Sequence, residues 1–345
     1  MDNAGNGRRG LRASPTATVL AALQEHYGIA GSRISDLGGS SNLNLLVADD
    51  HTRYVVRVYR PYVTAGRLAD IHLVRRELGR GGVPSAPVVP TGDGQPWVSV
   101  AGRLLEVEQF VEHDANMDSW DRLEAGLPLL GRIHSLLQNV EVSVEGRIPM
   151  FANHVEPGQT LPTTARGTAR IRGWQATPTE EHLARMADEL AELVSAGERD
   201  LVAALPRQLV HGDFWDNNVL FRDERVVLVA DLDFMGERAR IDDLALTLYL
   251  ADSSFGHDEA DGSRLARLRR LVDAYASGLD QPLTTRELAA LPWAMARQPL
   301  WGIGGWVASL DDAQAARGHA AGLPADVARA LHVVYEIDRW QQAFA

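Results

Sequence analysis

Residues 211–221 read HGDFWDNNVLF and residues 229–236 read VADLDFMG, and these two runs decide the fold. Asp213 and Asn218 stand five positions apart in the first run, and Asp231 follows an apolar stretch in the second. The tripeptide His-Gly-Asp alone carries little weight, because Asp is common in loops for its side-chain to backbone hydrogen bonds. Two acids and one amide at this joint spacing are much harder to obtain by chance, and they predict one shared polar site.

A short hairpin is predicted between the two runs. Apolar residues 219–221 and 226–229 flank the charged residues 222–225, which is the pattern of two antiparallel strands and their turn. Such a hairpin returns Asp231 to the edge where the loop of Asp213 begins. In phosphoryl transfer, one aspartate accepts the proton of the attacking hydroxyl, while an asparagine and a second aspartate hold magnesium beside the nucleotide phosphates. The spacing therefore predicts a phosphoryl-transfer centre.

Together with DDLALTLYL at 242–250, the two runs resemble the aminoglycoside phosphotransferase family, which also contains choline, homoserine and methylthioribose kinases. The resemblance implies an α+β, two-lobed, protein-kinase-like fold with a small antiparallel β-sheet lobe and a mainly helical second lobe. It implies an enzyme that transfers the γ-phosphate of ATP to a small-molecule hydroxyl with Mg²⁺, and GTP is not excluded as the nucleotide. It also implies roles for four residues: Asp213 as the catalytic aspartate, Asn218 and Asp231 as metal ligands, and Asp243 as a structural acid.

Two histidines near these runs are expected to be structural. His211 is similar to the family histidine that supports the catalytic loop, and we assign it no role as a base. His134 lies on the apolar face of a predicted helix, where a histidine is more often a satisfied core residue than a ligand.

Composition bounds the class of protein. The chain has 345 residues, 45% of them apolar, which suits two unequal globular lobes. Its formal net charge of −12 argues against nucleic acid as a partner and is compatible with a cationic substrate. No cysteine is present, which excludes disulfides and thiol chemistry. Residues 1–14 are polar and Gly-rich, and no apolar run approaches about 18 residues, so we expect a disordered tail, no membrane contact and a cytoplasmic location.

The amino-terminal part predicts an opening helix followed by an antiparallel meander. Ser14 and Pro15 begin the helix and Gly28 ends it. Turn residues then separate three apolar runs that predict strands at 34–38, 42–48 and 53–59.

The loop between the first two strands is a candidate phosphate-binding loop. It occupies the position of the kinase glycine-rich loop, where backbone amides and small polar side chains approach phosphates closely. Ser40, Ser41 and Asn42 are the candidate contacts. A plain hairpin loop explains the same residues, because GGSSN lacks the GxGxxG pattern.

A cation interrupts the third predicted strand. The kinase template places a lysine there, which contacts the phosphates and pairs with a glutamate on the following helix. Arg57 stands at this position and can hold phosphate oxygens with two parallel hydrogen bonds. Glu77, on a helix predicted at 65–80, is the expected partner of Arg57. The alternatives are a surface role for Arg57 and a local pairing of Glu77 with Arg76 or Arg80.

The last strand of the small lobe is expected to lead into a hinge. The remaining strands of this lobe are predicted at 83–89, 97–100 and 104–111. In the implied fold the hinge backbone binds the adenine edge, so the platform is expected at Glu108 to Val111, with Gln109 and Val111 as the candidate nucleotide-binding residues. The expected organisation is a nucleotide-binding lobe at 15–111 and a catalytic and substrate lobe at 112–345.

The larger lobe is predicted to be helical outside the catalytic hairpin. Apolar residues recur at helical spacing in six segments: 123–137, 180–204, 243–251, 263–277, 286–310 and 326–344. Residues 139–178 are rich in Gly, Pro, Thr and Arg and predict an irregular connection.

Two features are candidates for acceptor binding. The acidic segment 252–261 could bind an amine, and Trp293, Trp301 and Trp306 could stack on a ring or a cation. The simpler interpretations are a solvated loop and core packing. Asp233, two residues beyond the second metal aspartate, faces either the same cavity or solvent.

Three functions remain open from the sequence. The first is a kinase of an aminoglycoside-like antibiotic or other polyhydroxylated amine, and the second is a metabolic kinase for homoserine, choline or a similar small alcohol. The third is a catalytically silent nucleotide-binding protein, which the intact acids argue against. Many activities share this fold and chemistry, so the sequence does not name the acceptor.

Overall fold

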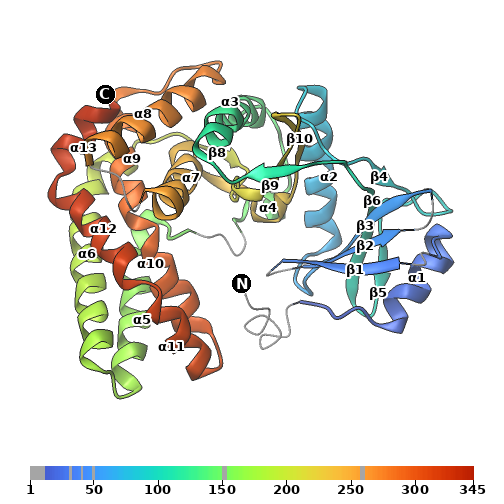
Figure 1. The fold of residues 1–345 in the computed structure, drawn as a ribbon, viewed down its shortest axis with the longest axis horizontal. Helices are drawn as coiled ribbons and strands as arrows, with labels where there is room; N and C mark the ends of the chain where they lie inside the picture. Colours follow the sequence, from blue (N-terminus) through green and yellow to red (C-terminus); the bar gives the residue numbers. More distant parts are fainter. Residues whose placement is uncertain (1–11, 31–32, 40–41, 49–50, 150–153, 257–260) are drawn as a thin grey trace.

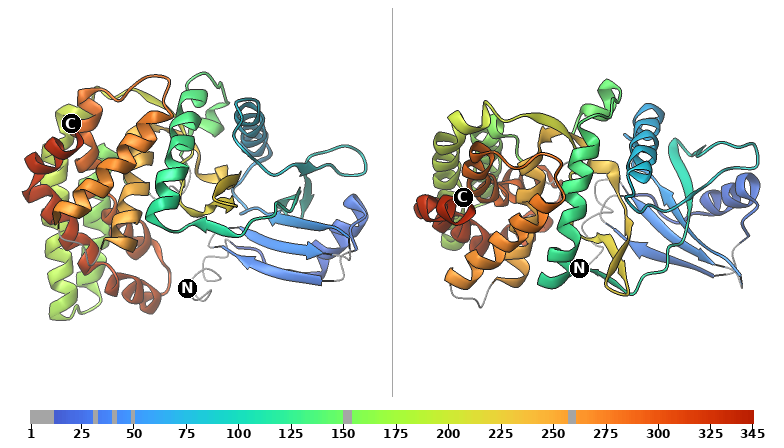
Figure 2. Two further views of the ribbon diagram at one scale, coloured as in Figure 1. Left: turned by 45° about the horizontal axis from the view of Figure 1, so that its top comes forward. Right: turned by 90° about the horizontal axis from the view of Figure 1, so that it is seen from above.

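The computed structural model describes residues 12–30, 33–39, 42–48, 51–149, 154–256 and 261–345. A β-sheet lobe and a helical lobe lie side by side, and helix α2 (Ala65–Arg80) lies between them (Figure 1). The same division is visible in both views of Figure 2. In the described part of the chain, no helix is long and apolar enough to cross a membrane. The predicted two-lobed α+β fold is confirmed.

The sheet of the small lobe is antiparallel and has the strand order β1-β2-β3-β6-β4, with β5 also paired to β6. Its strands are β1 (Arg33–Gly38), β2 (Leu43–Ala48), β3 (Arg53–Val58), β4 (Val88–Val89), β5 (Val98–Val100) and β6 (Arg103–Gln109). Successive side chains of a strand face opposite sides of a sheet. One face therefore collects buried apolar residues such as Val56 and Val107 and packs against α1 (Ala17–Tyr27). The other face carries Arg57 and points into the space between the lobes.

Helix α2 joins the two lobes through a buried arginine. The helix begins after Thr64, whose hydroxyl accepts from the backbone N–H of Arg67 at 3.1 Å. The Arg67 side chain donates four hydrogen bonds of 2.7–2.9 Å to carbonyl oxygens of the helical lobe, those of Glu145, Ile148, Asp233 and Met235. Since Arg67 is only 1% exposed, these carbonyls replace the water that the guanidinium loses on burial.

The larger lobe combines long helices with two small sheets. Its helices are α3 (Trp120–Leu137), α4 (Val144–Arg147), α5 (Thr160–Gly173), α6 (Pro178–Val202), α7 (Arg240–Phe255), α8 (Asp261–Ser277), α9 (Thr285–Arg297), α10 (Pro299–Trp301), α11 (Ala313–Ala321), α12 (Pro324–Tyr335) and α13 (Ile337–Phe344). One sheet has the order β10-β9-β7, from β7 (Ala115–Met117), β9 (Asp216–Arg222) and β10 (Arg225–Val229). The other pairs β8 (Arg207–Val210) with β11 (Gly236–Ala239).

The predicted hairpin is confirmed, because β9 and β10 pair antiparallel around a turn at Asp223 and Glu224. Strand β6 ends at Gln109, and the next strand, β7, pairs with β9 in the other lobe. The division after residue 111 stays a proposal.

Two predictions for the larger lobe are wrong. Residues 139–178 are not an irregular connection, because they contain α4 and the 14-residue helix α5. The helix expected at 286–310 is interrupted: α9 ends at Arg297, and a π-helix, η5 (Gly302–Val307), follows α10. The first error has a cause in the packing of α5. A Cβ on Gly167 of α5 would lie 2.3 Å from the carbonyl oxygen of Ile303, so the glycines serve close packing of α5 on η5 and not chain flexibility.

Candidate active site

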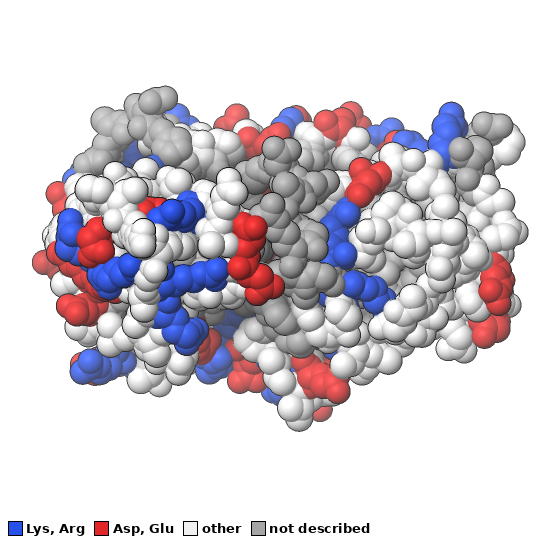
Figure 3. Space-filling view, turned by 90° about the horizontal axis from the view of Figure 1, so that it is seen from below, with Lys and Arg blue, Asp and Glu red and all other residues white. Residues whose placement is uncertain are grey.

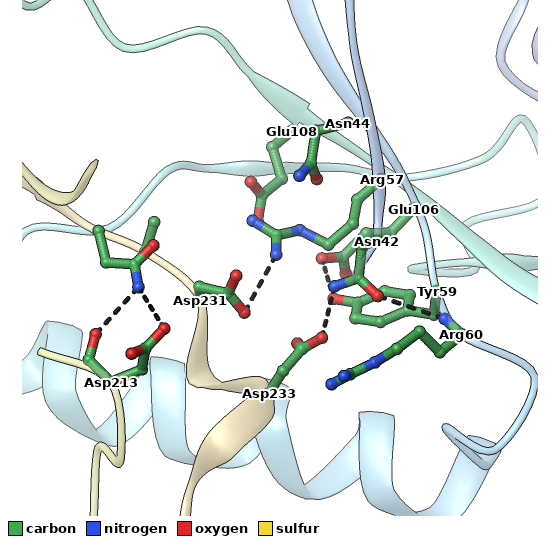
Figure 4. Close-up of polar contacts among 12 residues, drawn as sticks. Asn42, Asn44, Arg57, Tyr59, Arg60, Glu106, Glu108, Asp213, Asp231 and Asp233 are labelled. Carbon is green, nitrogen blue, oxygen red and sulfur yellow. Dashed lines mark hydrogen bonds and ion pairs between the residues drawn. The ribbon is translucent and has the colours of Figure 1, made fainter. Parts of the chain in front are cut away.

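The loop at 211–218 has a backbone that its sequence requires. Gly212 has φ of 86°, and a Cβ there would lie 2.2 Å from the carbonyl oxygen of Phe234. Only glycine fits such a conformation at such a distance. The loop closes on itself, since the Asn218 side-chain amide donates to both the carbonyl and the carboxylate Oδ2 of Asp213 at 2.9 Å (Figure 4). This pair orients the Asp213 carboxylate toward the cleft between the lobes.

His211 supports this loop, as the sequence predicts. Its Nε2 lies 3.1 Å from the carbonyl oxygen of Ala230, and its Nδ1 accepts from the backbone N–H of Asp213 at 3.3 Å. Burial is the main cause that lowers the pKa of His211 below its usual value. The neutral imidazole ring uses both nitrogens in contacts with the backbone, and it thereby links the loop of Asp213 to the segment that precedes Asp231.

Asp243, in the first turn of α7, supports the same loop by a hydrogen bond to its backbone. Its Oδ1 accepts from the backbone N–H of Gly212 at 3.1 Å, and its Oδ2 lies 3.0 Å from Nε2 of His134. The Tyr275 hydroxyl lies 2.7 Å from Nδ1 of the same histidine. Burial opposes the charge of Asp243, but the hydrogen bond and charge of His134 outweigh it and lower the pKa of Asp243. The structure therefore places both residues in the scaffolding roles expected for them.

We expect Asp243→Ala to lower the free energy of unfolding by about 3 kcal/mol, because it leaves the Gly212 N–H and the His134 ring buried without their partner. Urea denaturation measures this change. Asp273→Ala is the matched control. It removes the exposed partner of Arg269 and should cost less than about 1 kcal/mol. Equal losses in the two variants would contradict a scaffolding role for Asp243.

Asp231 lies where strand β10 ends, and its backbone is strained. Its φ and ψ are 62° and 65°, a left-handed conformation that is uncommon for residues other than glycine. Its Oδ1 is 3.3 Å from Nη1 of Arg57, the cation of β3 (Figure 4). Burial opposes the charge of Arg57, but the carboxylates of Asp231 and Glu108 outweigh it and raise the pKa of Arg57 above its usual value. Arg57 is thus a buried cation aimed at the second aspartate.

Arg57 stands where the kinase template has a lysine, and the rest of the chain shows the same preference for arginine. The chain contains no lysine, so all 34 of its basic side chains other than histidine are arginines. An arginine at the position where the kinase template has a lysine therefore follows the usage of the whole chain, and it keeps the positive charge.

The structure does not bring Glu77 to Arg57, so this predicted pair is wrong. The Glu77 carboxylate lies 2.6 Å from Arg80 on the outer side of α2, which is the alternative that the sequence left open. The residues of α2 that contact β6 include His72, whose Nε2 lies 2.7 Å from Glu106, and Arg75. The Arg75 guanidinium lies 2.6 Å from Glu108 and 3.4 Å from Glu106, both on β6. The helix therefore contributes the cation, and the strand contributes the carboxylates.

Asn42 is engaged with the opposite lobe. Its amide nitrogen donates to Asp233 at 2.5 Å, and its oxygen accepts from the backbone N–H of Arg60 at 3.2 Å. Asp233 is 3% exposed and contacts Asn42 of the small lobe, so it does not face solvent, and it is not among the residues that line the cavity. The candidates Ser40 and Ser41 lie outside the described residues. Asn42 also lines the cleft, and its role in nucleotide binding stays a proposal.

Stability should depend on the ionisation of Asp233. Burial, and after it the charge of Asp231, raise the pKa of Asp233 to about 6. A carboxyl with a raised pKa contributes stability below its unfolded-state pKa of about 4, and this contribution is lost as the pH rises to 6. We expect wild-type protein to lose on the order of 3 kcal/mol between pH 4 and 7 relative to Asp233→Asn. Unfolding free energies of both proteins across that range measure the difference, and parallel curves would contradict the assignment.

A cavity of about 460 Å³ lies between the lobes, within the range of small-ligand sites. It brings together seven of the predicted residues: Asn42, Arg57, Gln109, Val111, Asp213, Asn218 and Asp231. Apolar side chains form its walls, with Leu46, Val55 and Ala86 from the small lobe and Leu220 and Leu228 from the other. An apolar slot that ends in carboxylates and a cation suits a nucleotide with its phosphates at the polar end.

The polar end also fits a magnesium ion. Asp231 and the side-chain oxygen of Asn218 offer the hard oxygen ligands that Mg²⁺ prefers, and Mg²⁺ in nucleotide sites uses few protein ligands beside phosphates and water. Oδ1 of Asp231 is buried and has no hydrogen bond among the described residues. Its contact with Nη1 of Arg57 at 3.3 Å is an ion pair without a hydrogen bond, so a bound metal ion would add a ligand bond to this oxygen.

The features considered for acceptor binding have structural partners. Asp252 is buried and forms hydrogen bonds of 2.6 and 3.1 Å with Arg264. Trp293 packs over Gly197 of α6, and the Trp306 ring lies 5.8 Å from that of His319. Residues 257–260 of the acidic segment lie outside the described residues. Packing and ion pairing explain the parts that the structure describes.

The sequence placed the backbone of Glu108 in the expected adenine platform, but it did not reveal the Glu108 side chain as part of the site. It is 6% exposed and lines the cavity beside Arg57. A signal was present, because Glu106 and Glu108 alternate with apolar residues on β6. That alternation places them on the same face as the arginine of the neighbouring strand.

Fold and site together define a class of protein, a kinase-type phosphotransferase with two lobes around a nucleotide-sized cleft. Comparison with known proteins gives the family. The sequence profile of the phosphotransferase enzyme family matches residues 33–280, and the chain belongs to this family. The predicted enzyme class and the ATP and divalent-metal chemistry of that class are confirmed.

Curated relatives include homoserine kinases. The protein of Zymomonas mobilis is 24% identical over 275 residues, covering 79% of this chain and 80% of the relative. That of Bradyrhizobium sp. (strain ORS 278) is 25% identical over 292 residues and covers 80% of each.

Solved structures with the same fold include small-molecule kinases. A microcompartment-associated aminopropanol kinase has a TM-score of 0.70 at 18% identity, covering 93% of this chain and 98% of its own. The amicoumacin kinase hAmiN, solved in complex with AMP-PNP, Ca²⁺ and Ami, has a TM-score of 0.65 at 15% identity and covers 96% of this chain and 93% of its own. At these identities the likeness establishes the fold.

Proposed function

We propose that this protein transfers the γ-phosphate of ATP to a hydroxyl group of a small, amine-bearing molecule. The observation that carries the proposal is the meeting of Asp213, Asn218 and Asp231 at the polar end of the cleft. Each comes from a different part of the catalytic hairpin and its loop, and each has the chemistry that phosphoryl transfer needs.

In this proposal, Asp213 orients the acceptor hydroxyl and accepts its proton as the oxygen attacks phosphorus and ADP leaves. Asn218 fixes the rotamer of Asp213 and, with Asp231, would hold Mg²⁺. When bound, the metal neutralises charge on the phosphate oxygens. Arg57 contacts the same oxygens from the small lobe. Positioning and electrostatics therefore supply most of the rate, as is usual for this reaction.

The acceptor class rests on chemistry shared by the relatives. Homoserine and aminopropanol each join a hydroxyl to an amine, and other matched structures carry aminoglycosides such as gentamicin. The net charge of −12 favours a cationic acceptor. On the face shown in Figure 3, acidic and basic side chains are interspersed.

Within this class we favour an antibiotic-like or other polyhydroxylated amine as the acceptor. A small metabolic amino alcohol such as homoserine is the second candidate, and its support is the agreement of the curated relatives over about 80% of the chain. The test is a panel of aminoglycosides, homoserine, choline, aminopropanol and uncharged sugars, assayed for ATP-dependent phosphorylation with mass detection. Phosphorylation of uncharged sugars alone would reject the amine requirement, and no ATP consumption with any acceptor would reject the kinase assignment for these classes.

A further inference from the structure

Glu108 presents a fixed carboxylate to the inner wall of the cleft. It is paired in register with Val55 across β3 and β6, and both residues line the cavity. Its Oε1 lies 2.6 Å from Nη1 of Arg75, and the side chain is 8% exposed. Among the described residues, no hydrogen bond engages the second oxygen, Oε2. The guanidinium of Arg57 lies between Glu108 and Asp231 (Figure 4).

The position of a bound base follows from the two ends of the cavity. The phosphates belong near Asp231 and Arg57, where the metal ligand and the buried cation are. The base then belongs between the apolar walls, where Val55 and Ala86 face Leu220 across the slot. A flat purine is favoured there because it buries apolar surface on both faces. Glu108 borders this slot beside Val55, so its carboxylate faces an edge of the base and not a face.

Adenine and guanine differ most at the purine 6-position. Adenine carries an amine there, which donates hydrogen bonds, whereas guanine and hypoxanthine carry a carbonyl oxygen, which accepts. An ionised carboxylate can only accept. Where it faces the 6-substituent, it therefore pairs with the 6-amine of adenine and repels the 6-oxygen of guanine, whereas a carboxylate that faced N1 would accept from the N1–H of guanine or hypoxanthine.

We propose that Glu108 selects adenine nucleotides over guanine and hypoxanthine nucleotides by accepting a hydrogen bond from the purine 6-amine. The inference rests on the proposed function and adds to it the residue that selects the base of the phosphate donor. Arg75 acts as the positioning residue, because it holds one oxygen of Glu108 and so fixes the direction of the other. A buried acceptor that loses its donor and meets another acceptor discriminates strongly.

A purely structural role for Glu108 makes a different prediction. If Glu108 serves only as a counter-ion for Arg75 and Arg57, its loss lowers stability and weakens all nucleotides alike. Glu106 provides the matched control. It contacts the same Arg75 from the same strand, yet it is fully buried and does not line the cavity.

The experiment is isothermal titration calorimetry of the full chain with Mg²⁺ and four nucleoside diphosphates, those of adenosine, 2-aminoadenosine, inosine and guanosine. The two 6-amino nucleotides should bind about tenfold or more tightly than the two 6-oxo nucleotides. In Glu108→Gln, whose amide both donates and accepts, the ratio of ADP to IDP affinity should fall toward one. In Glu106→Gln, the ratio should stay at the wild-type value even if the protein is less stable.

Equal binding of ADP and IDP by the wild type would overturn the inference while leaving the kinase proposal intact. If Glu108→Gln keeps the wild-type ratio of ADP to IDP affinity, the inference is also overturned. It is overturned as well if 2-aminoadenosine diphosphate binds as weakly as GDP. If Glu108→Gln does not fold, the wild-type series of four nucleotides decides alone. Binding of none of the four would overturn the proposed function together with this inference.

Discussion

Replacing Asp213 with asparagine should lower the rate of phosphate transfer by roughly 10²–10⁴-fold, the usual contribution of a positioned general base. The asparagine keeps the shape of the side chain, and the loop that Gly212 and Asp243 hold should stay folded. ATP binding should therefore be unchanged. Initial rates with an acceptor identified from the panel, together with calorimetric titration of ATP, measure the two effects separately.

Asp216→Asn is the control for this substitution. Asp216 lies three residues further along the chain, at the start of β9, and does not line the cavity. Its replacement should leave turnover close to the wild-type rate. Preserved turnover in Asp213→Asn, or an equal loss in both variants, would remove Asp213 from the catalytic role.

Asp231→Asn should weaken the magnesium-dependent part of ATP binding by about 10- to 100-fold or more, since even partners of metal ligands contribute that much. Asparagine suits this position better than alanine as a test, because it tolerates the left-handed backbone at φ of 62°. The neutral amide removes one charge from the metal site and from the ion pair with Arg57. Titrations of ATP with Mg²⁺ and with EDTA give the metal-dependent difference.

Asp223 offers a close control in the turn of the same hairpin. It shares a positive φ, of 49°, but its side chain is 88% exposed and remote from the cleft. Asp223→Asn should leave the metal-dependent difference as it is. If Asp231→Asn keeps the wild-type difference between ATP affinity with Mg²⁺ and with EDTA, another group holds the metal.

Local patterns were sufficient for the catalytic hairpin and for helix α2. The strands around residues 222–225 and the helix at Ala65–Arg80 follow from apolar alternation, capping residues and terminal glycines, all within a few positions of one another. The meeting of Asp213, Asn218 and Asp231 is equally local, because a single short hairpin brings them together.

The partner of Arg57 was not predictable in the same way. Residues 75 and 77 are two positions apart and point about 200° away from each other around a helix, so a small error in helix phase exchanges their faces. The face that meets the sheet is chosen by Glu106 and Glu108, about 30 residues further along the chain. A template that expects a glutamate on the helix directs attention to Glu77 and away from the arginine that faces the sheet.

Helix α5 was missed because its composition is that of a loop. Its glycine and threonines lower helix propensity, yet the helix forms because small residues allow close packing. Gly167 meets Ile303 of η5, and Gly304 of η5 meets Thr163 of α5. Close packing of this kind involves two segments more than 130 residues apart, so neither segment shows it alone.

The buried guanidinium of Arg67 limits how the chain can be divided. A fragment that ended near residue 111 would keep Arg67 but lose all four of its carbonyl acceptors, and a fragment that began there would keep the acceptors without the donor. In each half, polar groups that are buried in the whole protein would then be exposed or left without hydrogen-bond partners. Chimeras with related enzymes should therefore exchange α2 together with residues 145–148 and 233–235, and split versions of the protein should regain structure only when both halves are present.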